Sequence, residues 1–184
     1  MQGHFHAPRL SPEPQGTLTL GMGTATNVDR LTIRHDMLGA VSADAAGVDA
    51  DQGSTESSDA TESDEDTLGS ASTTPRDRPR RLLLGQLGMG QGSEYQRYAQ
   101  AVVDRSAWAI VAEGELNTAA YGGVLRAKRP VLVRGVGTAL GGKYYVERVL
   151  HLFTDSGYTQ RFTLRRNAVG LPAGQRFGRG GDDA

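Results

Sequence analysis

Several kinds of residue and segment are missing from this chain or rare in it. Among its 184 residues there is no cysteine, which excludes disulfides, thiolate zinc sites and cysteine nucleophiles together. Aromatic residues make up only 6% of the chain, and no apolar run approaches the roughly 20 residues that a membrane-spanning helix requires. The N-terminal stretch MQGHFHAPRLSPEPQG has no apolar signal core. We therefore expect a cytoplasmic protein with no membrane partner.

Charge is nearly balanced in total but unevenly distributed along the chain. The 20 Lys and Arg residues and the 21 Asp and Glu residues give a net charge of −1, which by itself predicts no nucleic-acid partner. Residues 44–66 carry acidic side chains and no Lys or Arg, whereas residues 76–81 and 126–134 are rich in arginine. Glycine is abundant, with 25 residues, and the apolar fraction is 38%. This composition predicts that part of the chain is unfolded.

Composition divides the first half of the chain into three segments. Residues 1–15 contain three prolines and no periodicity, and we expect them to be disordered. Residues 16–48 are a predicted β segment, because 17–21 and 31–35 alternate with period two and 37–48 could supply a third, weaker strand. Residues 49–80 are acidic, rich in Ser and Thr and almost free of aliphatic side chains. We expect them to form a disordered linker or an exposed loop insertion.

Residues 81–169 are predicted to fold as a helix followed by a β-barrel, before a flexible tail at 170–184. Ser93 and Gln96 have the spacing of a capping box, and helical periodicity continues until Gly114 ends the predicted helix. Four strands separated by Gly-containing turns follow, and the last alternates as Tyr-x-Gln-x-Phe-x-Leu-x-Arg. The expected strands are Leu116–Tyr121, Val131–Gly135, Tyr144–Phe153 and Tyr158–Arg166. The expected core residues are Tyr98, Val102, Trp108, Tyr145, Val149 and Phe162.

Glycine-rich stretches and histidines do not form a convincing ligand site in the sequence. The stretches 21–23 and 88–92 lack the Lys-Ser/Thr of a phosphate loop, so we interpret them as turns or linkers. His4 and His6 have the spacing of a metal chelate but no matching pair of ligands elsewhere. His151 falls on a predicted strand and is expected to be a buried or cross-strand histidine. We therefore predict no cofactor and no metal.

Carboxylate pairs are the only other candidates for catalysis. Glu113 and Glu115 straddle the predicted junction of helix and strand, and Asp64 and Asp66 lie in the predicted linker. Paired carboxylates perform acid–base chemistry when their environments separate their pKa values, and neither pair has a supporting constellation. We predict that the protein is not an enzyme, with a hydrolase using Glu113 or Glu115 as a weaker alternative.

A basic stretch offers a candidate interaction surface. It consists of Arg126, Lys128, Arg129 and Arg134, close to Tyr121. We interpret it as a solvated or partner-facing strand edge and as the candidate assembly interface. The alternative is a single-stranded nucleic-acid-binding barrel, which would combine a basic groove with exposed aromatic rings.

The span from Ala99 to Gly170 resembles a known family in the order of several short features. They are Ala112-Glu113-Gly114, the Gly-x-Tyr-x-Val at Gly142–Val146, the stretch Val149–His151 and the closing Phe-x-Leu-x-Arg-Asn at Phe162–Asn167. Leu20-Gly21 through Asn27-Val28, followed by Met37-Leu38, resembles an upstream segment. Together these features resemble the C-terminal barrel of the phage late control protein D family, the baseplate hub proteins of contractile phage tails and contractile injection systems. Valine-glycine-repeat spike proteins of type VI secretion carry a similar hub.

This resemblance implies a fold and a role. The fold is α+β and mainly β, a tail-tube-like antiparallel β-barrel flanked by one helix. The implied role is a structural baseplate hub without enzymatic activity, which forms a trimer, joins the spike protein to the inner tube protein, contacts other baseplate proteins and is assembled into the particle. Family hubs carry another barrel upstream, so we expect a truncated, mis-started or split hub, with the needle on a separate polypeptide.

Overall fold

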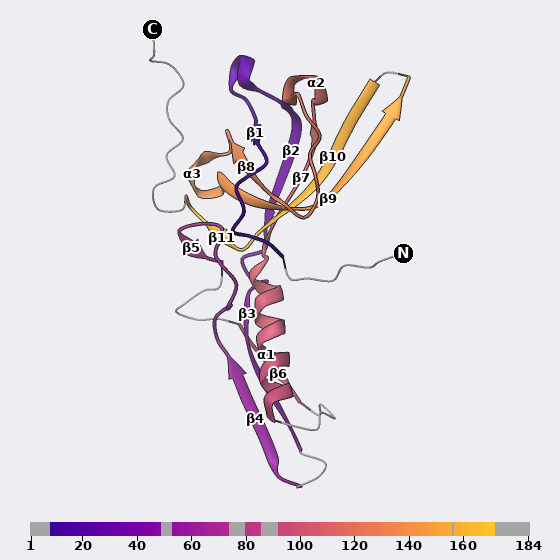
Figure 1. Cartoon of the computed structure of the whole chain (residues 1–184). Helices are drawn as coiled ribbons and strands as arrows, with labels where there is room; N and C mark the ends of the chain where they lie inside the picture. The colour runs from indigo at the N-terminus through magenta and orange to yellow at the C-terminus, as the bar shows by residue number, and fades with distance from the viewer. Residues whose placement is uncertain (1–7, 49–52, 74–79, 86–91, 156, 172–184) are drawn as a thin grey trace.

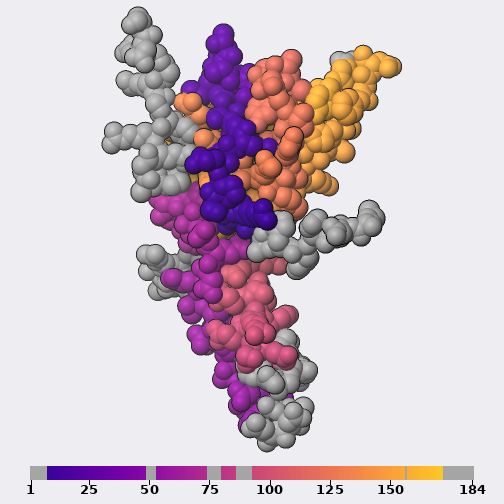
Figure 2. Space-filling view, viewed as in Figure 1, coloured from indigo at the N-terminus to yellow at the C-terminus, as the bar shows by residue number. Residues whose placement is uncertain are grey.

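A computed structural model of the chain describes residues 8–48, 53–73, 80–85, 92–155 and 157–171. A curled sheet forms the broad end of the molecule, and one helix with three strands forms a narrower part below it (Figure 1). The space-filling view has the same outline, with magenta and pink segments in the narrow part (Figure 2). We call the broad end the half-barrel and the narrow part the arm.

Six strands make up the half-barrel sheet, in the order β1-β8-β9-β10-β7-β2. Neighbouring strands are antiparallel except for β1 and β8, which are parallel. The strands are β1 (Thr17–Thr19), β2 (Val28–His35), β7 (Ile110–Leu116), β8 (Pro130–Arg134), β9 (Gly142–Thr154) and β10 (Gly157–Arg166). Three short helical segments lie in the connections: η1 (Gly23–Ala25), α2 (Thr118–Tyr121) and α3 (Gly137–Leu140). β9 and β10 form a long hairpin that extends past β8 (Figure 1).

The alternation in the last predicted strand determines which side chains enter the core. Along β10, Gln160, Phe162, Leu164 and Arg166 are buried, because every second side chain of a strand points to the same face. The buried amide of Gln160 accepts from the Leu125 N–H at 2.8 Å and holds the connection before β8 against the sheet. The core of the half-barrel consists of Leu18, Val28, Ile110, Ala112, Leu116, Leu125, Val131, Val133, Tyr144, Val146, Phe162 and Leu164.

The two edge strands of the half-barrel are joined at one end by an asparagine. The Asn27 side chain accepts from the Thr19 N–H at 2.8 Å and donates to the Thr17 carbonyl at 2.9 Å. Its backbone N–H also donates to the Thr19 carbonyl at 3.0 Å. Asparagine side chains can replace backbone partners in this way. Among the described residues no strand pairing continues this link, so the sheet is an open half-barrel.

The arm is a three-stranded sheet covered on one face by a helix. Its sheet has the order β4-β3-β6, with β3 (Val41–Val48), β4 (Thr55–Ala60) and β6 (Arg80–Leu84), and its helix is α1 (Gly92–Ala107). Tyr95, Ala99 and Val103 of α1 are each 0% exposed. Their spacing of four residues places them on one face of the helix. That face packs against Ala43 and Ala45 of β3, whose small side chains allow a close approach.

The residues just after β10 hold the segment that returns from the arm to the half-barrel. The buried Asn167 side chain accepts from the Leu68 N–H at 3.0 Å and donates to the Asp66 carbonyl at 3.0 Å. Just beyond Asn167, β11 (Ala168–Val169) pairs with β5 (Ala71–Ser72). The arm and the half-barrel are therefore connected by side-chain and backbone hydrogen bonds.

Arg166 is the largest fully buried side chain of the molecule's described part, at 0% exposure. Its guanidinium donates to the Gly141 carbonyl at 2.9 Å and to the Leu68 carbonyl at 3.3 Å, and also to the Gly170 carbonyl. It lies 5.3 Å from the centroid of the Tyr144 ring. Burial lowers the pKa of Arg166, while the nearby Tyr144 raises it. Arg166 therefore joins three chain segments from inside the molecule.

The mainly β fold class expected from the sequence is confirmed, as is the presence of few helices. The expected strands at 17–21, 31–35, 131–135, 144–153 and 158–166 match β1, β2, β8, β9 and β10 within a few residues.

The expectation of disorder at 49–80 is wrong for its described residues, which are 53–73 and Arg80, the first residue of β6. Residues 53–73 contain β4 and β5, and Ala60 and Leu68 are 4% and 3% exposed. The segment has few aliphatic residues, but β3 supplies its backbone partners and Asp104 of α1 accepts from the Ser63 hydroxyl at 2.8 Å. Neighbouring elements thus compensate for the small apolar area. Residues 49–52 and 74–79 lie outside the described residues.

The N-terminal segment is also better ordered than expected in its described part. Leu10 is 7% exposed and packs with Leu68 and Tyr145. The Gln15 N–H donates to the Pro130 carbonyl at 3.0 Å. Residues 1–7 and 172–184 lie outside the described residues.

The predicted helix is too long. α1 ends at Ala107, and residues 110–116 form β7, because they pair with β2 on one side and β10 on the other. Ser93 is inside α1 and does not precede it, and Gln96 bonds to Ser58 of β4, so the predicted capping box is wrong. The predicted strand at 116–121 keeps only its first residue, since α2 follows.

The grouping of residues 16–48 as one β segment is also corrected. β1 and β2 belong to the half-barrel, whereas β3 belongs to the sheet of the arm. Of the expected core residues, Tyr145 and Phe162 are buried and Val102, Trp108 and Val149 are half-buried. Tyr98 is 39% exposed, because the face of α1 that meets the sheet is the one with Tyr95 and Ala99.

Candidate assembly interface

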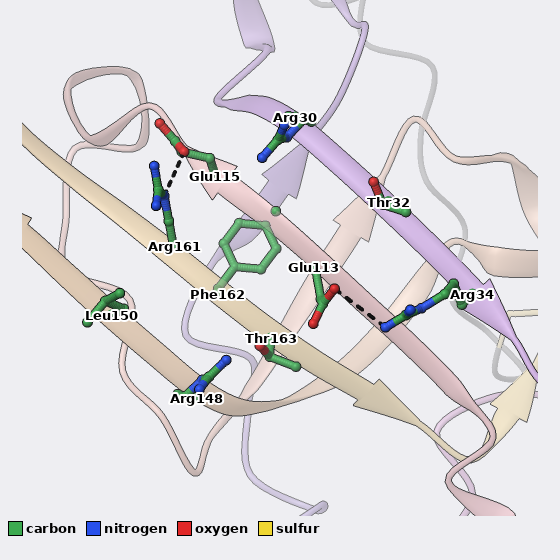
Figure 3. Close-up of a pocket in the computed structure, with 11 residues that line it drawn as sticks. Arg30, Thr32, Arg34, Glu113, Glu115, Arg148, Leu150, Arg161, Phe162 and Thr163 are labelled. Carbon is green, nitrogen blue, oxygen red and sulfur yellow. Dashed lines mark hydrogen bonds and ion pairs between the residues drawn. The ribbon is translucent and has the colours of Figure 1, made fainter.

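The outer face of the half-barrel carries arginine and glutamate side chains from four neighbouring strands (Figure 3). The register places Arg30 of β2 and Arg161 of β10 on either side of Glu115 of β7. Two residues from Glu115 on β7, Glu113 lies between Thr32 of β2 and Thr163 of β10. Arg148 of β9 lies beside Thr163. We call this surface the charged face; it comprises Arg30, Thr32, Arg34, Glu113, Glu115, Arg148, Arg161 and Thr163.

Two ion pairs lie within the charged face. Arg161 Nε is 3.0 Å from Glu115 Oε2, and Arg34 Nη2 is 3.5 Å from Glu113 Oε2. These side chains are between 29% and 72% exposed, so each pair contributes only about 0–1 kcal/mol to stability. The four arginines and two glutamates give the charged face a net charge of +2. A hollow of about 320 Å³ lies over the charged face.

The geometry of Glu113 and Glu115 does not favour acid–base chemistry. Both carboxylates project from the same face of β7 and both pair with arginine. A catalytic pair needs two contrasting environments, and these two environments are similar. Asp64 and Asp66, the other predicted pair, take part in hydrogen bonds through their backbone: the Asp64 N–H donates to Asp104 and the Asp66 carbonyl accepts from Asn167.

The basic stretch singled out in the sequence does not form one strand edge. Arg126, Lys128 and Arg129 are exposed on the connection between α2 and β8, and Arg134 is half-buried at the end of β8. Lys128 has a positive φ of 66°, and its Nζ lies 6.0 Å from the centroid of the Tyr145 ring.

Aromatic rings near the basic stretch are turned into the structure. Tyr121 packs against the core of the half-barrel, and Tyr145 is only 7% exposed. Burial raises the pKa of both hydroxyls. A stacking platform for bases requires accessible ring faces, which these two residues do not provide.

A groove of about 910 Å³ lies at the junction of the arm and the half-barrel. Trp108 follows α1 there, with its ring centroid 5.8 Å from that of Tyr145. Its indole Nε1 donates to Glu65 Oε2 at 2.6 Å. Burial raises the pKa of Glu65; the bond from Trp108 lowers it, and the nearby charge of Asp104 raises it further.

The end of the β9–β10 hairpin carries an exposed aromatic cluster that sequence reasoning missed. Phe153 is 76% exposed and stacks on Tyr158, with centroids 4.5 Å apart. His151 Nδ1 lies 2.7 Å from the Tyr158 hydroxyl oxygen. His151 is therefore a cross-strand histidine, exposed rather than buried. Aromatic residues on both sides of the predicted turn at 155–157 were the signal for this cluster.

The structure describes only some of the remaining candidate ligands. In the part of the chain that the structure describes, no three His, Asp or Glu side chains are placed to hold a metal ion. The positive φ angles of Gly21 and Gly23 are typical of turn residues. His4, His6 and residues 88–91 lie outside the described residues. Within the described ranges, no helix is sufficiently long and apolar to cross a membrane.

Comparison with known proteins identifies a shared fold. No family model matches the sequence, and no curated protein matches it. The 43 kDa tail protein of prophage MuSo2 from Shewanella oneidensis matches with a TM-score of 0.61 at 18% identity, over 86% of this chain and 46% of that one. The tail protein from Neisseria meningitidis matches with a TM-score of 0.61 at 11% identity, over the same shares of the two chains.

A chain in the virion of a native gene transfer agent particle aligns less well, with a TM-score of 0.40 at 16% identity, over 83% of this chain and 32% of that one. This chain spans about half the length of the two tail proteins, and it shares their fold over most of its own length.

Proposed function

We propose that this chain is a structural protein of a phage tail or of a related contractile particle. The observation that carries the proposal is the fold, since 86% of the chain superimposes on two tail proteins with a TM-score of 0.61. A fold alone does not decide function, which depends on the surfaces it presents. The surfaces described above are suited to assembly: exposed charge pairs, an exposed aromatic cluster and unpaired strand edges.

The strand edges support assembly most directly. β2 is the last strand of its sheet, and the described part of β9 beyond Val146 pairs with β10 but not with β8. Edges of this kind add strands from other chains readily. Closed symmetric assembly is the common way in which proteins use complementary surfaces of identical copies.

The finer proposal is a baseplate hub. In this role the chain has no enzymatic activity, forms a trimer, and joins the spike protein to the inner tube protein within the assembled particle. We assign the exposed cations Arg126, Lys128 and Arg129 to a contact with another tail component, because they lie on a connection outside the sheet. The hydrogen bonds between Arg126 and Gln15 use only the backbone of Arg126 and leave its guanidinium for a partner, whereas the Lys128 ammonium lies 6.0 Å from the centroid of the Tyr145 ring.

The test is the composition and yield of particles from a strain that encodes this chain. Mass spectrometry of purified particles should detect the chain, and deletion of its gene should abolish intact particles in electron micrographs. A strain carrying Arg126→Glu/Arg129→Glu should also lose particles, although the purified variant should keep the circular dichroism of the wild type, since exposed charges contribute little to stability.

Cross-linking followed by mass spectrometry tests the finer proposal. A hub should cross-link to both the spike and the inner tube protein, whereas a tube subunit should cross-link mainly to further tube subunits. Purified particles that lack the chain would rule out the tail role. Normal particle yield together with salt-sensitive oligonucleotide binding would favour a nucleic-acid-binding barrel, because phosphate contacts weaken steeply with salt.

A further inference from the structure

A row of acidic side chains runs along the arm. Asp59 lies near the end of β4, and Glu62, Asp64 and Asp66 follow in the segment that leads towards the half-barrel. We call these four residues the acidic stripe. All four are exposed; among the described residues none of them forms an ion pair, although Asp59 lies near the cation Arg81.

The backbone of the acidic stripe is held against α1, which leaves the carboxylates outside. Gln100 Nε2 donates to the Glu62 carbonyl at 3.0 Å, and Asp104 Oδ1 accepts from the Asp64 N–H at 3.0 Å. Asp104 also accepts from Gln100 at 3.0 Å. These bonds fix the path of the segment, so the acidic stripe is a surface of defined shape rather than a solvated tail.

The charged face lies on the half-barrel and has the opposite charge. It has a net charge of +2, and two of its arginines, Arg30 and Arg148, are exposed and have no carboxylate at ion-pair distance within the described ranges. The acidic stripe contributes a charge of −4. Clusters of like charge repel one another, and a complementary surface on a partner relieves this repulsion and orients the encounter.

We propose that the charged face of one copy binds the acidic stripe of a second copy of this chain. Arg30 and Arg148 supply the cations that still lack partners, and Glu62 and Asp64 are among the carboxylates that meet them. The two surfaces are different patches of the same molecule, so the contact is head-to-tail, and such contacts close into rings when the rotation permits. The inference deepens the proposed assembly role by naming the two surfaces that join.

A second copy fits the charged face better than nucleic acid does. Glu113 and Glu115 lie between the arginines on β7, where they would repel a continuous row of phosphates. Separate carboxylate side chains can approach the outer arginines and avoid the two glutamates. A surface on which the two signs alternate is more selective for a protein partner with fixed charges than for a uniform polyanion.

The first measurement is self-association of the purified full chain by sedimentation velocity over a range of concentrations. Association should be clear in about 0.05 M NaCl and weaken at least about ten-fold in about 0.5 M NaCl, because salt screens exposed charges. Two variants alter one surface each: Arg30→Glu/Arg148→Glu changes the charged face from +2 to −2, and Glu62→Lys/Asp64→Lys changes the acidic stripe from −4 to 0. Each alone should remain monomeric at concentrations where the wild type associates.

Mixing the two variants gives the sharpest result. In an equimolar mixture, the two lysines introduced into the acidic stripe of one variant can meet the two glutamates introduced into the charged face of the other, and the unaltered charged face of the first matches the unaltered acidic stripe of the second. The mixture should therefore associate again, although neither variant does so alone. Arg9→Glu/Arg80→Glu is the matched control, since both arginines are exposed and the double change makes the same change in net charge outside the charged face and the acidic stripe. It should associate like the wild type.

Several results would overturn the proposal. The first is a wild-type chain that stays monomeric in low salt, whether or not it binds oligonucleotides. The second is either altered variant associating as the wild type does. The third is a mixture that stays monomeric although both variants keep the wild-type circular dichroism. A neutral pair, Arg30→Gln/Arg148→Gln, checks the charged face if the reversal to Glu unfolds the chain, and it should also lose association. These results concern purified protein and are independent of incorporation into particles, so failure of one proposal leaves the other testable.

Discussion

Replacing the buried arginine at the end of β10 should destabilise the protein more than any exposed charge change. Arg166 is 0% exposed and donates to the carbonyls of Gly141, Leu68 and Gly170. Arg166→Met keeps much of the side-chain length and removes every donor. The three carbonyl groups then lose a charged hydrogen-bond partner inside the protein, and the segment from the arm loses one of its attachments to the half-barrel.

The magnitude follows from these contacts. A hydrogen bond to a charged group contributes about 1.5–3 kcal/mol, and a buried acceptor without a partner costs about 1–3 kcal/mol. Two effects offset part of this loss: the guanidinium no longer has to be desolvated, and the methionine buries apolar surface worth about 1.5–3 kcal/mol. We expect Arg166→Met to lower the free energy of unfolding by about 3–5 kcal/mol, the net of three carbonyl acceptors left without a partner and the two offsetting effects.

Urea denaturation measures the change, with the fluorescence of the single tryptophan, Trp108, as a probe of the junction. Arg165→Met is the matched control. Arg165 is half-exposed and pairs with Glu147 at 2.9 Å, so its loss should cost about 0–1 kcal/mol. If Arg166→Met unfolds within about 1 kcal/mol of the wild type, the buried guanidinium does not hold the junction together and the reasoning is wrong.

Two further substitutions test the core and the junction groove. A Cβ at Gly114 would lie 2.5 Å from the Arg30 carbonyl oxygen and 2.6 Å from Phe162 Cζ, so Gly114→Ala should lower stability by about 1–3 kcal/mol. In thermal unfolding followed by circular dichroism, Gly123→Ala, whose nearest contact is 3.6 Å away, should have little effect on the melting temperature. Equal melting temperatures for the two variants would contradict the packing. Burial raises the pKa of Glu65, so the folded protein holds the proton of this carboxyl group more tightly than the unfolded chain does. The resulting contribution to folding stability is fully present below the pKa that Glu65 has in the unfolded chain, and it is lost as the pH rises through the pKa that Glu65 has in the folded protein. Glu65→Gln should therefore gain stability relative to the wild type between about pH 4 and about pH 7, and an identical difference in melting temperature at both pH values would argue against this account.

Local alternation predicted the strands of the half-barrel well. The pattern from Tyr158 to Arg166 gives β10 directly, because a strand with one buried face imposes a period of two on its residues. The same argument located β1 and β2, and Gly-containing turns in the sequence marked the limits of β8 and β9. It also placed Phe162 in the core. These predictions depend only on near neighbours in the sequence, which is why they did not need the tertiary structure.

Prediction failed where distant segments compensate for weak local signals. β4 has the composition of a linker, and only its pairing with β3 and the contacts with α1 make it a strand. Residues 110–113 continue a helical pattern, and strands on both sides convert them into β7. Pairing with a distant strand adds hydrogen bonds and burial that no local window contains, so it overrides local preference.

The candidate assembly interface shows the same division. The sequence alone determined that the chain has no cysteine chemistry, that its charge is segregated and that its C-terminal third is built of strands. Only the tertiary structure brought Arg30, Glu115, Arg161 and Arg148 from four strands onto one face, and fixed the acidic stripe along the arm. The physical reason is that a strand's sequence specifies which residues share its face, whereas its neighbours in the sheet are chosen by long-range pairing and burial.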